Sequence, residues 1–138
     1  MTTSAKKLNV SALIVTRSSP NGELEILNVL AHGKSKYGFP GGKLEEGETP
    51  LQAVHRETEE ELGATPTNVN YLQTSKALTP EGLEIEMHIF GGTVHDEIEP
   101  RHEIKELHWL TYEQMAANLD LLTPMTIEHV LPLLRNKV

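Results

Sequence analysis

The chain contains no cysteine among its 138 residues. Disulfide bonds, thiolate metal sites and cysteine nucleophiles are therefore excluded. The chain also lacks any apolar run close to the roughly 18 residues that cross a membrane. Residues 1–7 lead into strand-like sequence instead of the apolar core of a signal peptide. We therefore expect a cytoplasmic protein without a membrane partner.

Basic side chains are the minority among the charged ones. Twelve lysines and arginines stand against 20 aspartates and glutamates, which gives a net charge of -8 at pH 7. A nucleic-acid backbone needs a basic face, so binding to nucleic acid is disfavoured. A small polyphosphate remains compatible with this charge, because a divalent cation can bridge clustered carboxylates to phosphate oxygens.

The length fits one compact domain with a buried core. No internal repeat, low-complexity tract or linker interrupts the sequence, so we expect a single domain over residues 1–138. Apolar patterns between turn residues predict strands over residues 8–16, 24–30, 71–78, 83–90 and 107–110. The first two strands and the next two should form hairpins, and residues 32–47 read as a loop.

Three helices are expected. Thr49 is a good N-cap, Pro50 suits the first helical position, Gln52 completes a capping box and Gly63 supplies a left-handed end. The predicted core-facing stripe of this helix is Leu51, Val54, Thr58 and Leu62.

The second helix should begin at the cap Thr111, and the third at Thr123-Pro124, with Pro132 kinking or ending it. Helices packed on a mixed sheet indicate an α+β fold or an α/β/α sandwich.

Three glutamates of the first helix share one face. Glu57, Glu60 and Glu61 stand at i, i+3 and i+4, beside the apolar stripe, so they should lie where the sheet forms the other wall of a cleft. Carboxylates this close repel one another, and a hard cation such as Mg²⁺ or Mn²⁺ reverses that repulsion. Arg56 adds a fixed positive charge that can orient a carboxylate. An acidic helix face alone is more often solvated surface.

Other functional interpretations are weaker. His102 and His108 lie near Glu103 and Glu106, but the zinc-protease pattern H-E-x-x-H is absent. Trp109 on a late strand is more often a core residue than a stacking platform for a base. Two aromatic residues, Tyr37 and Phe39, precede a pair of glycines and are better placed to border a pocket.

Seven residues resemble the signature of the Nudix family, G-x5-E-x7-R-E-U-x-E-E-x-G-U. They are Gly42, Glu48, Arg56, Glu57, Glu60, Glu61 and Gly63. Seven such identities arise by chance about once in 10⁸ windows. The two bulky aliphatic positions of the signature are Thr58 and Ala64 here, and both are packing positions. The resemblance implies a Nudix-type α/β/α sandwich with a mixed sheet.

The resemblance also implies a set of site residues. Glu57, Glu60 and Glu61 would bind Mg²⁺, or Mn²⁺, with the carbonyl of Gly42 contributing, and the change Glu60→Gln would lower turnover by orders of magnitude. Glu48 and Arg56 would support the cluster. The general base in the family varies in position, so Glu57, Glu103 and Glu106 are all open, with Glu103 preferred.

The residues expected to contact substrate are His32, Lys43 and Phe39, with Lys34 a further cation, because the chain lacks an arginine that many MutT-like members carry after the second strand.

By the same resemblance, the expected activity is hydrolysis of a diphosphate linkage in a nucleotide. A MutT-like nucleoside triphosphate pyrophosphohydrolase is preferred. An ADP-ribose or nucleotide-sugar pyrophosphatase is the alternative, for which Pro80 is a weak indication. A nucleotide-binding sensor domain without hydrolysis is the alternative of a different class, although such domains often lose the carboxylates that this chain keeps. The partner would be a small-molecule nucleotide, and the family is often dimeric, so a homodimer stays open.

Overall fold

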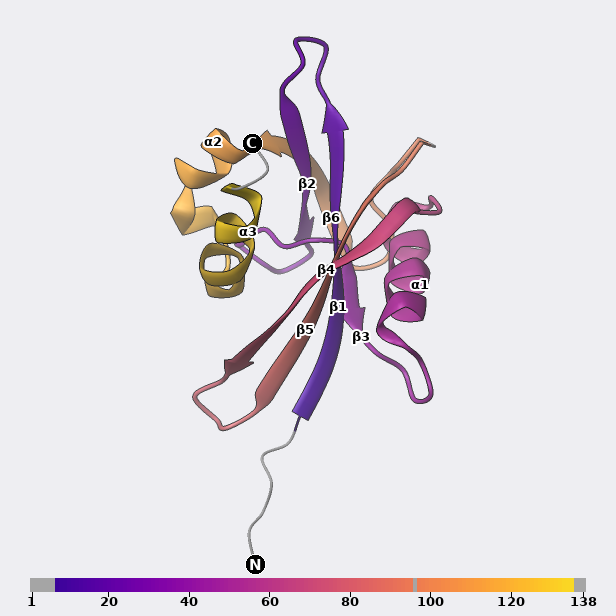
Figure 1. Ribbon diagram of the computed structural model, residues 1–138, viewed down its shortest axis with the longest axis vertical. Helices are drawn as coiled ribbons and strands as arrows, with labels where there is room; N and C mark the ends of the chain where they lie inside the picture. The colour runs from indigo at the N-terminus through magenta and orange to yellow at the C-terminus, as the bar shows by residue number, and fades with distance from the viewer. Residues whose placement is uncertain (1–6, 96, 136–138) are drawn as a thin grey trace, which may run out of the picture.

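The computed structural model describes residues 7–95 and 97–135. In this part of the chain, α1 (Pro50–Leu62) covers one face of a mixed sheet, and α2 (Tyr112–Ala116) and α3 (Leu131–Arg135) lie on the other side (Figure 1). The strands are β1 (Lys7–Ser18), β2 (Leu24–Ala31), β3 (Gly41–Lys43), β4 (Thr67–Leu78), β5 (Glu84–Thr93) and β6 (Ile104–Thr111). Their order is β4-β5-β1-β2-β6, with β3 pairing β1 beside this path. The predicted α+β fold with a mixed sheet is confirmed.

The central strand β1 is forked along one edge. It runs parallel to β5 on its other edge. On the forked edge, residues 10–12 pair with β3, and residues 16–18 pair antiparallel with β2. Between these two stretches the amide of Leu13 donates to the carbonyl of Pro40, while Val29 of β2 pairs with Gly38. The chain from Gly38 to Gly41 therefore enters between β1 and β2 and parts them.

Two apolar clusters lie on opposite faces of the sheet. Alternate residues of β1 point to opposite sides, as the period of a strand requires. In the first apolar cluster, Leu13 and Val15 pack with Val54 and Leu62 of α1. In the second, Ile14 packs with residues of α2 and α3. Because each face of the sheet is covered by helix, the three-layer arrangement expected from the sequence is confirmed.

The ends of α1 lie where the sequence predicts them. Thr49 and Gln52 form the reciprocal capping box, and Gly63 ends the helix at φ 71°. The predicted stripe is correct at Val54, Thr58 and Leu62, which are fully buried, but wrong at Leu51, which is 46% exposed. Helical periodicity gives the direction of a side chain around the axis. It does not say how far along the axis the covering sheet extends.

Two further expectations need correction. The segment 32–47 is not a continuous loop, because residues 41–43 form β3. The third helical segment is not simply kinked or ended at Pro132. A π-helix, η2 (Thr126–Val130), precedes α3, and Pro132 is the second residue of α3. Proline lacks the amide hydrogen that an α-helical turn would use, and a wider turn just before it accommodates this loss.

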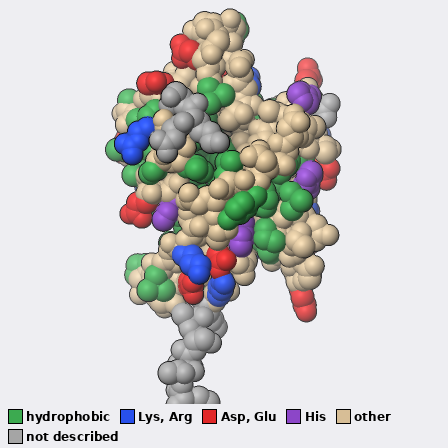
Figure 2. All heavy atoms as spheres, in the orientation of Figure 1, with side chains coloured by type: hydrophobic (Ala, Val, Ile, Leu, Met, Phe, Trp, Pro, Cys, Tyr) green, Lys and Arg blue, Asp and Glu red, His purple; other side chains and the backbone are tan. Residues whose placement is uncertain are grey.

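A short 3-10 helix, η1 (Leu119–Leu121), follows α2. Within residues 7–95 and 97–135, no helix is long and apolar enough to cross a membrane. On the face drawn in Figure 2, acidic side chains are spread mainly around the rim and do not gather at the centre. The carboxylate side chains that are relevant to chemistry lie together beside α1.

Candidate active site

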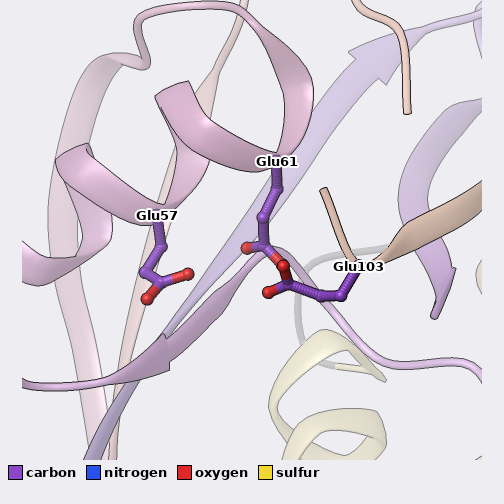
Figure 3. Close-up of side chains that lie close together, drawn as sticks. All are labelled: Glu57, Glu61 and Glu103. Atoms are coloured by element: carbon purple, nitrogen blue, oxygen red, sulfur yellow. The ribbon is translucent and has the colours of Figure 1, made fainter. Parts of the chain in front are cut away.

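Three carboxylates meet between α1 and the loop before β6. Oxygen atoms of Glu57, Glu61 and Glu103 all lie within 4.8 Å of one another. Glu57 and Glu61 project from α1, and Glu103 reaches them from the opposite side (Figure 3). Glu57 and Glu61 are largely buried, while Glu103 is exposed. We call these three residues the acidic group.

The two glycines at the start of β3 allow the acidic group to form. The amide of Gly41 donates to Oε1 of Glu61 at 2.7 Å. Gly42 lies against Glu57, since a Cβ atom added to it would stand 2.9 Å from the carboxyl carbon. A side chain at Gly42 would therefore displace Glu57. The sequence singled out Gly42, and the role of Gly41 was not foreseen.

Arg56 links the acidic group to the loop that precedes α1. Its guanidinium donates from Nε and Nη2 to the two oxygens of Glu48, at 2.7 and 2.9 Å, and from Nη1 to Glu57 at 2.8 Å. It also donates to the carbonyl of Lys43. These bonds, with the amide of Glu45, lower the pKa of Glu48 to about 2. Glu48 in turn raises the pKa of Arg56. Arg56 thus orients Glu57 as a permanently charged donor.

Glu60 lies apart from the acidic group. Its side chain is 47% exposed, and its nearest described ion-pair partner is Arg56 at 3.4 Å. The helical spacing placed Glu57, Glu60 and Glu61 on one face, but the sheet covers only the Glu57 and Glu61 side of that face. The structure therefore brings together two of the three glutamates expected from the helix and adds Glu103.

The two acidic residues considered before β6 have different surroundings. Glu103 joins the acidic group, whereas Glu106 lies on β6 and accepts a hydrogen bond from His108 at 2.7 Å. His108 also stacks on Tyr37, with ring centroids 5.0 Å apart. Trp109 is partly buried, packs against the margin of the first apolar cluster and lies under Arg17, so it borders the core without being fully buried in it.

Burial and crowding raise the pKa values of the two carboxylates that α1 contributes, Glu57 and Glu61. Burial raises the pKa of Glu61 to about 8, and the charges of Glu57 and Glu103 add to this, against the opposing hydrogen bond from Gly41. Burial likewise raises the pKa of Glu57, although Arg56 opposes the rise. A cation bound between these carboxylates would offset both their burial and their mutual repulsion. Clustered carboxylate oxygens of this kind match the ligands that Mg²⁺ and Mn²⁺ prefer.

A cavity of about 550 Å³ opens beside the acidic group. It lies beside the segment that parts β1 and β2, and Gly41, Glu61 and Glu103 belong to its wall as well as to the site. The rest of its lining is Val29, Ala31, Lys34, Ser35, Lys36, Gly38, Phe39, Ile104 and Thr123. A ligand could therefore contact the acidic group and the cavity at once.

Of the residues predicted to contact substrate, two line the cavity and two do not. Phe39 lines the cavity, and so does Lys34. His32 and Lys43 are exposed and are not among the described lining residues. Lys36 and Thr123 were not foreseen. Lys36 donates to the carbonyl of Asp120 at 2.6 Å, which ties the cavity loop to η1, a contact between segments far apart in sequence that no local pattern reveals.

One prediction concerns the metal-free protein. A glutamate in the unfolded chain has its ordinary pKa, whereas the pKa of Glu61 in the folded chain is about 8. The folded state therefore keeps a proton that the unfolded state releases. This stability is present at pH 5 and is lost as pH rises toward 8, by on the order of 3 kcal/mol. The change Glu61→Gln should remove this dependence and leave the Gly41 hydrogen bond in place.

Urea unfolding of both proteins in EDTA, at pH 5.5 and pH 8, measures the effect. The parent should lose stability relative to the glutamine variant at the higher pH. A difference between the two proteins that stays the same at both pH values would contradict the prediction.

The chain is similar to known proteins in sequence and in fold. The family model described as NUDIX domain matches residues 7–133. An 8-oxo-dGTP diphosphatase of Escherichia coli K12 is 43% identical over 70 residues, which are 49% of this chain and 53% of that protein. An RNA pyrophosphohydrolase of Helicobacter pylori G27 is 29% identical over 115 residues, which are 82% of this chain and 67% of that protein. The chain thus spans only about half of the first relative.

A solved structure extends the likeness to the whole fold. The solution structure of the E. coli ORF135 protein is similar with a TM-score of 0.70 and 29% identity, covering 94% of this chain and 87% of that one. The family match begins at the first residue of β1 and runs through β3 and α1, which carry the glycine and glutamate signature, into α3. The chain belongs to the NUDIX domain family.

Proposed function

We propose that this chain hydrolyses a diphosphate linkage in a small nucleotide with the help of Mg²⁺ or Mn²⁺. The observation that carries the proposal is the shared wall, in which Glu61 and Glu103 belong both to the acidic group and to the 550 Å³ cavity. A nucleotide could then place its phosphates at the acidic group and its base deeper in the cavity.

The residues present fit a hard divalent cation. Three carboxylates offer oxygen atoms within 4.8 Å of one another, and burial leaves Glu57 and Glu61 with raised pKa values that a cation would offset. Glu57, Glu61 and Glu103 would hold the cation, and the backbone of Gly42 lies against Glu57. Glu60 is a further carboxylate at the exposed margin. When bound, the cation would neutralise the diphosphate and favour formation of the attacking hydroxide.

The protein's own groups supply the remaining steps. Glu103 is the exposed member of the acidic group, so it is the carboxylate that a water molecule can reach and to which it can give a proton. The water oxygen bonds to phosphorus as the bridging phosphorus–oxygen bond breaks. Lys34, in the cavity wall, would contribute a positive charge near phosphate oxygens, and Phe39 would offer an aromatic surface to a base. Catalysis would then consist mainly of positioning and electrostatic stabilisation.

A nucleoside triphosphate is the preferred substrate, giving a monophosphate and pyrophosphate. Two relatives support this choice by their names, an 8-oxo-dGTP diphosphatase and an RNA pyrophosphohydrolase. The net charge of -8 favours the small nucleotide over RNA. An ADP-ribose pyrophosphatase is less favoured. Pro80, its one indication in the sequence, lies in the turn of the β4–β5 hairpin, where the amide of Gly82 donates to the carbonyl of Thr79.

A substrate panel tests the proposal. Purified protein would be incubated with nucleoside triphosphates including 8-oxo-dGTP, with ADP-ribose, nucleotide sugars and dinucleoside polyphosphates, in Mg²⁺, in Mn²⁺ and in EDTA. We expect release of pyrophosphate from a triphosphate, and no release in EDTA. Faster cleavage of ADP-ribose would favour the alternative pyrophosphatase. Tight nucleotide binding with no cleavage of any compound would favour a sensor domain.

A further inference from the structure

We propose that Arg101 is a positioning residue, which seats the loop before β6 on the end of α1 and so holds Glu103 in the acidic group. This inference rests on the proposed metal site and concerns how that site is completed. Two of its carboxylates sit on a rigid helix, but the third comes from a segment with no regular structure. Something must fix that segment, because a carboxylate on a loose loop would spend most of its time in solvent.

Main-chain hydrogen bonds attach the loop to the exit of α1. The amide of Glu99 donates to the carbonyl of Leu62 at 3.1 Å, and the amide of Arg101 donates to the carbonyl of Glu61 at 2.9 Å. Carbonyls in the last turn of a helix have no partner within the helix, so they are natural anchors for a passing chain. The loop therefore bonds to the backbone of Glu61 itself, whose side chain is in the acidic group.

On the far side of Glu103 the chain is anchored again. The carbonyl of Glu103 accepts a hydrogen bond from the amide of His32 at 2.7 Å, and Ile104 is buried in the first apolar cluster. His102, just before Glu103, has φ 55°, in the left-handed region that a non-glycine residue seldom adopts. Glu103 thus projects from a tight turn fixed at both ends.

The side chain of Arg101 adds a contact that the backbone cannot supply. Its guanidinium lies on Gly63, because a Cβ atom added to Gly63 would stand 2.6 Å from Cζ and 2.7 Å from Nε. The same guanidinium donates to Glu99 from Nε and Nη2, at 2.9 and 2.7 Å. Arg101 therefore connects Glu99 of the loop with Gly63, the residue that ends α1 and has no side chain.

The direction in which Arg101→Ala changes the affinity for a cation distinguishes a positioning role from a purely electrostatic one. Arg101 is positively charged, so removing its charge would by itself strengthen cation binding nearby. If Arg101 acts by placing Glu103, the change Arg101→Ala should instead weaken binding. Affinity for Mn²⁺ alone, measured by electron paramagnetic resonance without substrate, reports this independently of turnover.

A double-mutant cycle would show whether Arg101 acts through Glu103. We expect Arg101→Ala to weaken Mn²⁺ binding by about tenfold, in the range found for groups that support metal sites, and Glu103→Gln, which removes a ligand charge, to weaken it at least as much. Combined, they should weaken it no more than Glu103→Gln alone, because the residue being positioned has already lost its charge. Losses that multiply in the double variant, or tighter binding by Arg101→Ala, would overturn the proposal.

A matched pair of glycine variants tests the contact with Gly63. Gly63 and Gly82 both have positive φ, at 71° and 84°, but only at Gly63 would a Cβ meet a neighbour. Both changes to alanine strain the backbone similarly, whereas only Gly63→Ala should weaken Mn²⁺ binding, by pushing Arg101 away. Equal Mn²⁺ affinity in the two variants would count against the contact.

The failure of this inference can be told from failure of the metal site. Glu57→Gln should weaken Mn²⁺ binding whether or not Arg101 matters. If Glu57→Gln leaves affinity unchanged, the metal site is wrong and this inference falls with it. If Glu57→Gln weakens binding and Arg101→Ala does not, the site stands and the positioning role of Arg101 is rejected.

Discussion

Replacing Glu57 with glutamine is expected to lower turnover by about three orders of magnitude. An oxygen of Glu57 lies within 4.8 Å of oxygens of Glu61 and Glu103. Glu57 also accepts a hydrogen bond from Arg56 and lies against the backbone of Gly42. Glutamine keeps the shape and can still accept the hydrogen bond from Arg56, so the fold should persist. The loss would reflect a missing ligand charge.

Steady-state kinetics at saturating Mg²⁺ measures this loss, with unfolding curves to verify the fold. Glu59→Gln is the matched control, since it removes the same charge from the same helix at an exposed position whose side chain bonds only to Thr65 among the described residues. Near-parental turnover in Glu57→Gln would refute the ligand assignment.

The change Glu60→Gln separates two ligand sets. The family resemblance includes Glu60, whereas the structure places it at the exposed margin with Arg56. A loss of turnover as large as that of Glu57→Gln would favour Glu57, Glu60 and Glu61 as the ligands. A small loss would favour Glu57, Glu61 and Glu103.

The change Gly41→Ala is expected to destabilise the protein by about 3 kcal/mol or more. Its Cβ would stand 2.0 Å from the carbonyl oxygen of Ser11, and the backbone has φ 148°. The obstacle is main chain in a buried strand, so it cannot swing aside as a flexible side chain would. The pairing of β3 with β1 would open, and Glu61 would lose the amide that holds it.

Thermal unfolding in EDTA tests this, with a fall in Tm of roughly 10 °C expected. Gly38→Ala is the control for stability, because a Cβ at Gly38 meets nothing within 4 Å. An alanine at residue 41 that unfolds at the parental temperature would show that β3 can shift, and that the backbone there does not fix Glu61.

Local features of the fold were predictable from the sequence. The capping residues Thr49, Gln52 and Gly63 fix the ends of α1 through bonds to neighbours within a few residues. Thr111 and Gln114 form a second capping box at α2 for the same reason. Such bonds depend only on nearby residues, so a single chain reveals them.

Features that depend on contacts between segments far apart in the sequence were harder to predict. The spacing of Glu57, Glu60 and Glu61 shows that they share a helix face, but not which part of that face the sheet covers. Glu103 was favoured through the family resemblance, and its position beside Glu61 depends on the hydrogen bonds between the loop and α1. The family signature singled out Gly42 and not Gly41, whose role follows only from the close approach of β1.

The forked edge of β1 bears on how a ligand would enter. The cavity is lined by Gly38, Phe39 and Gly41, from the segment that parts β2 from β1. Residues 11–15 of β1 are buried and paired on their other edge with β5. The cavity is thus formed by the framework of the sheet, and no loop has to close to create it. Because the net charge of -8 repels an incoming anion, we expect the encounter rate with a nucleotide to rise as ionic strength screens that repulsion.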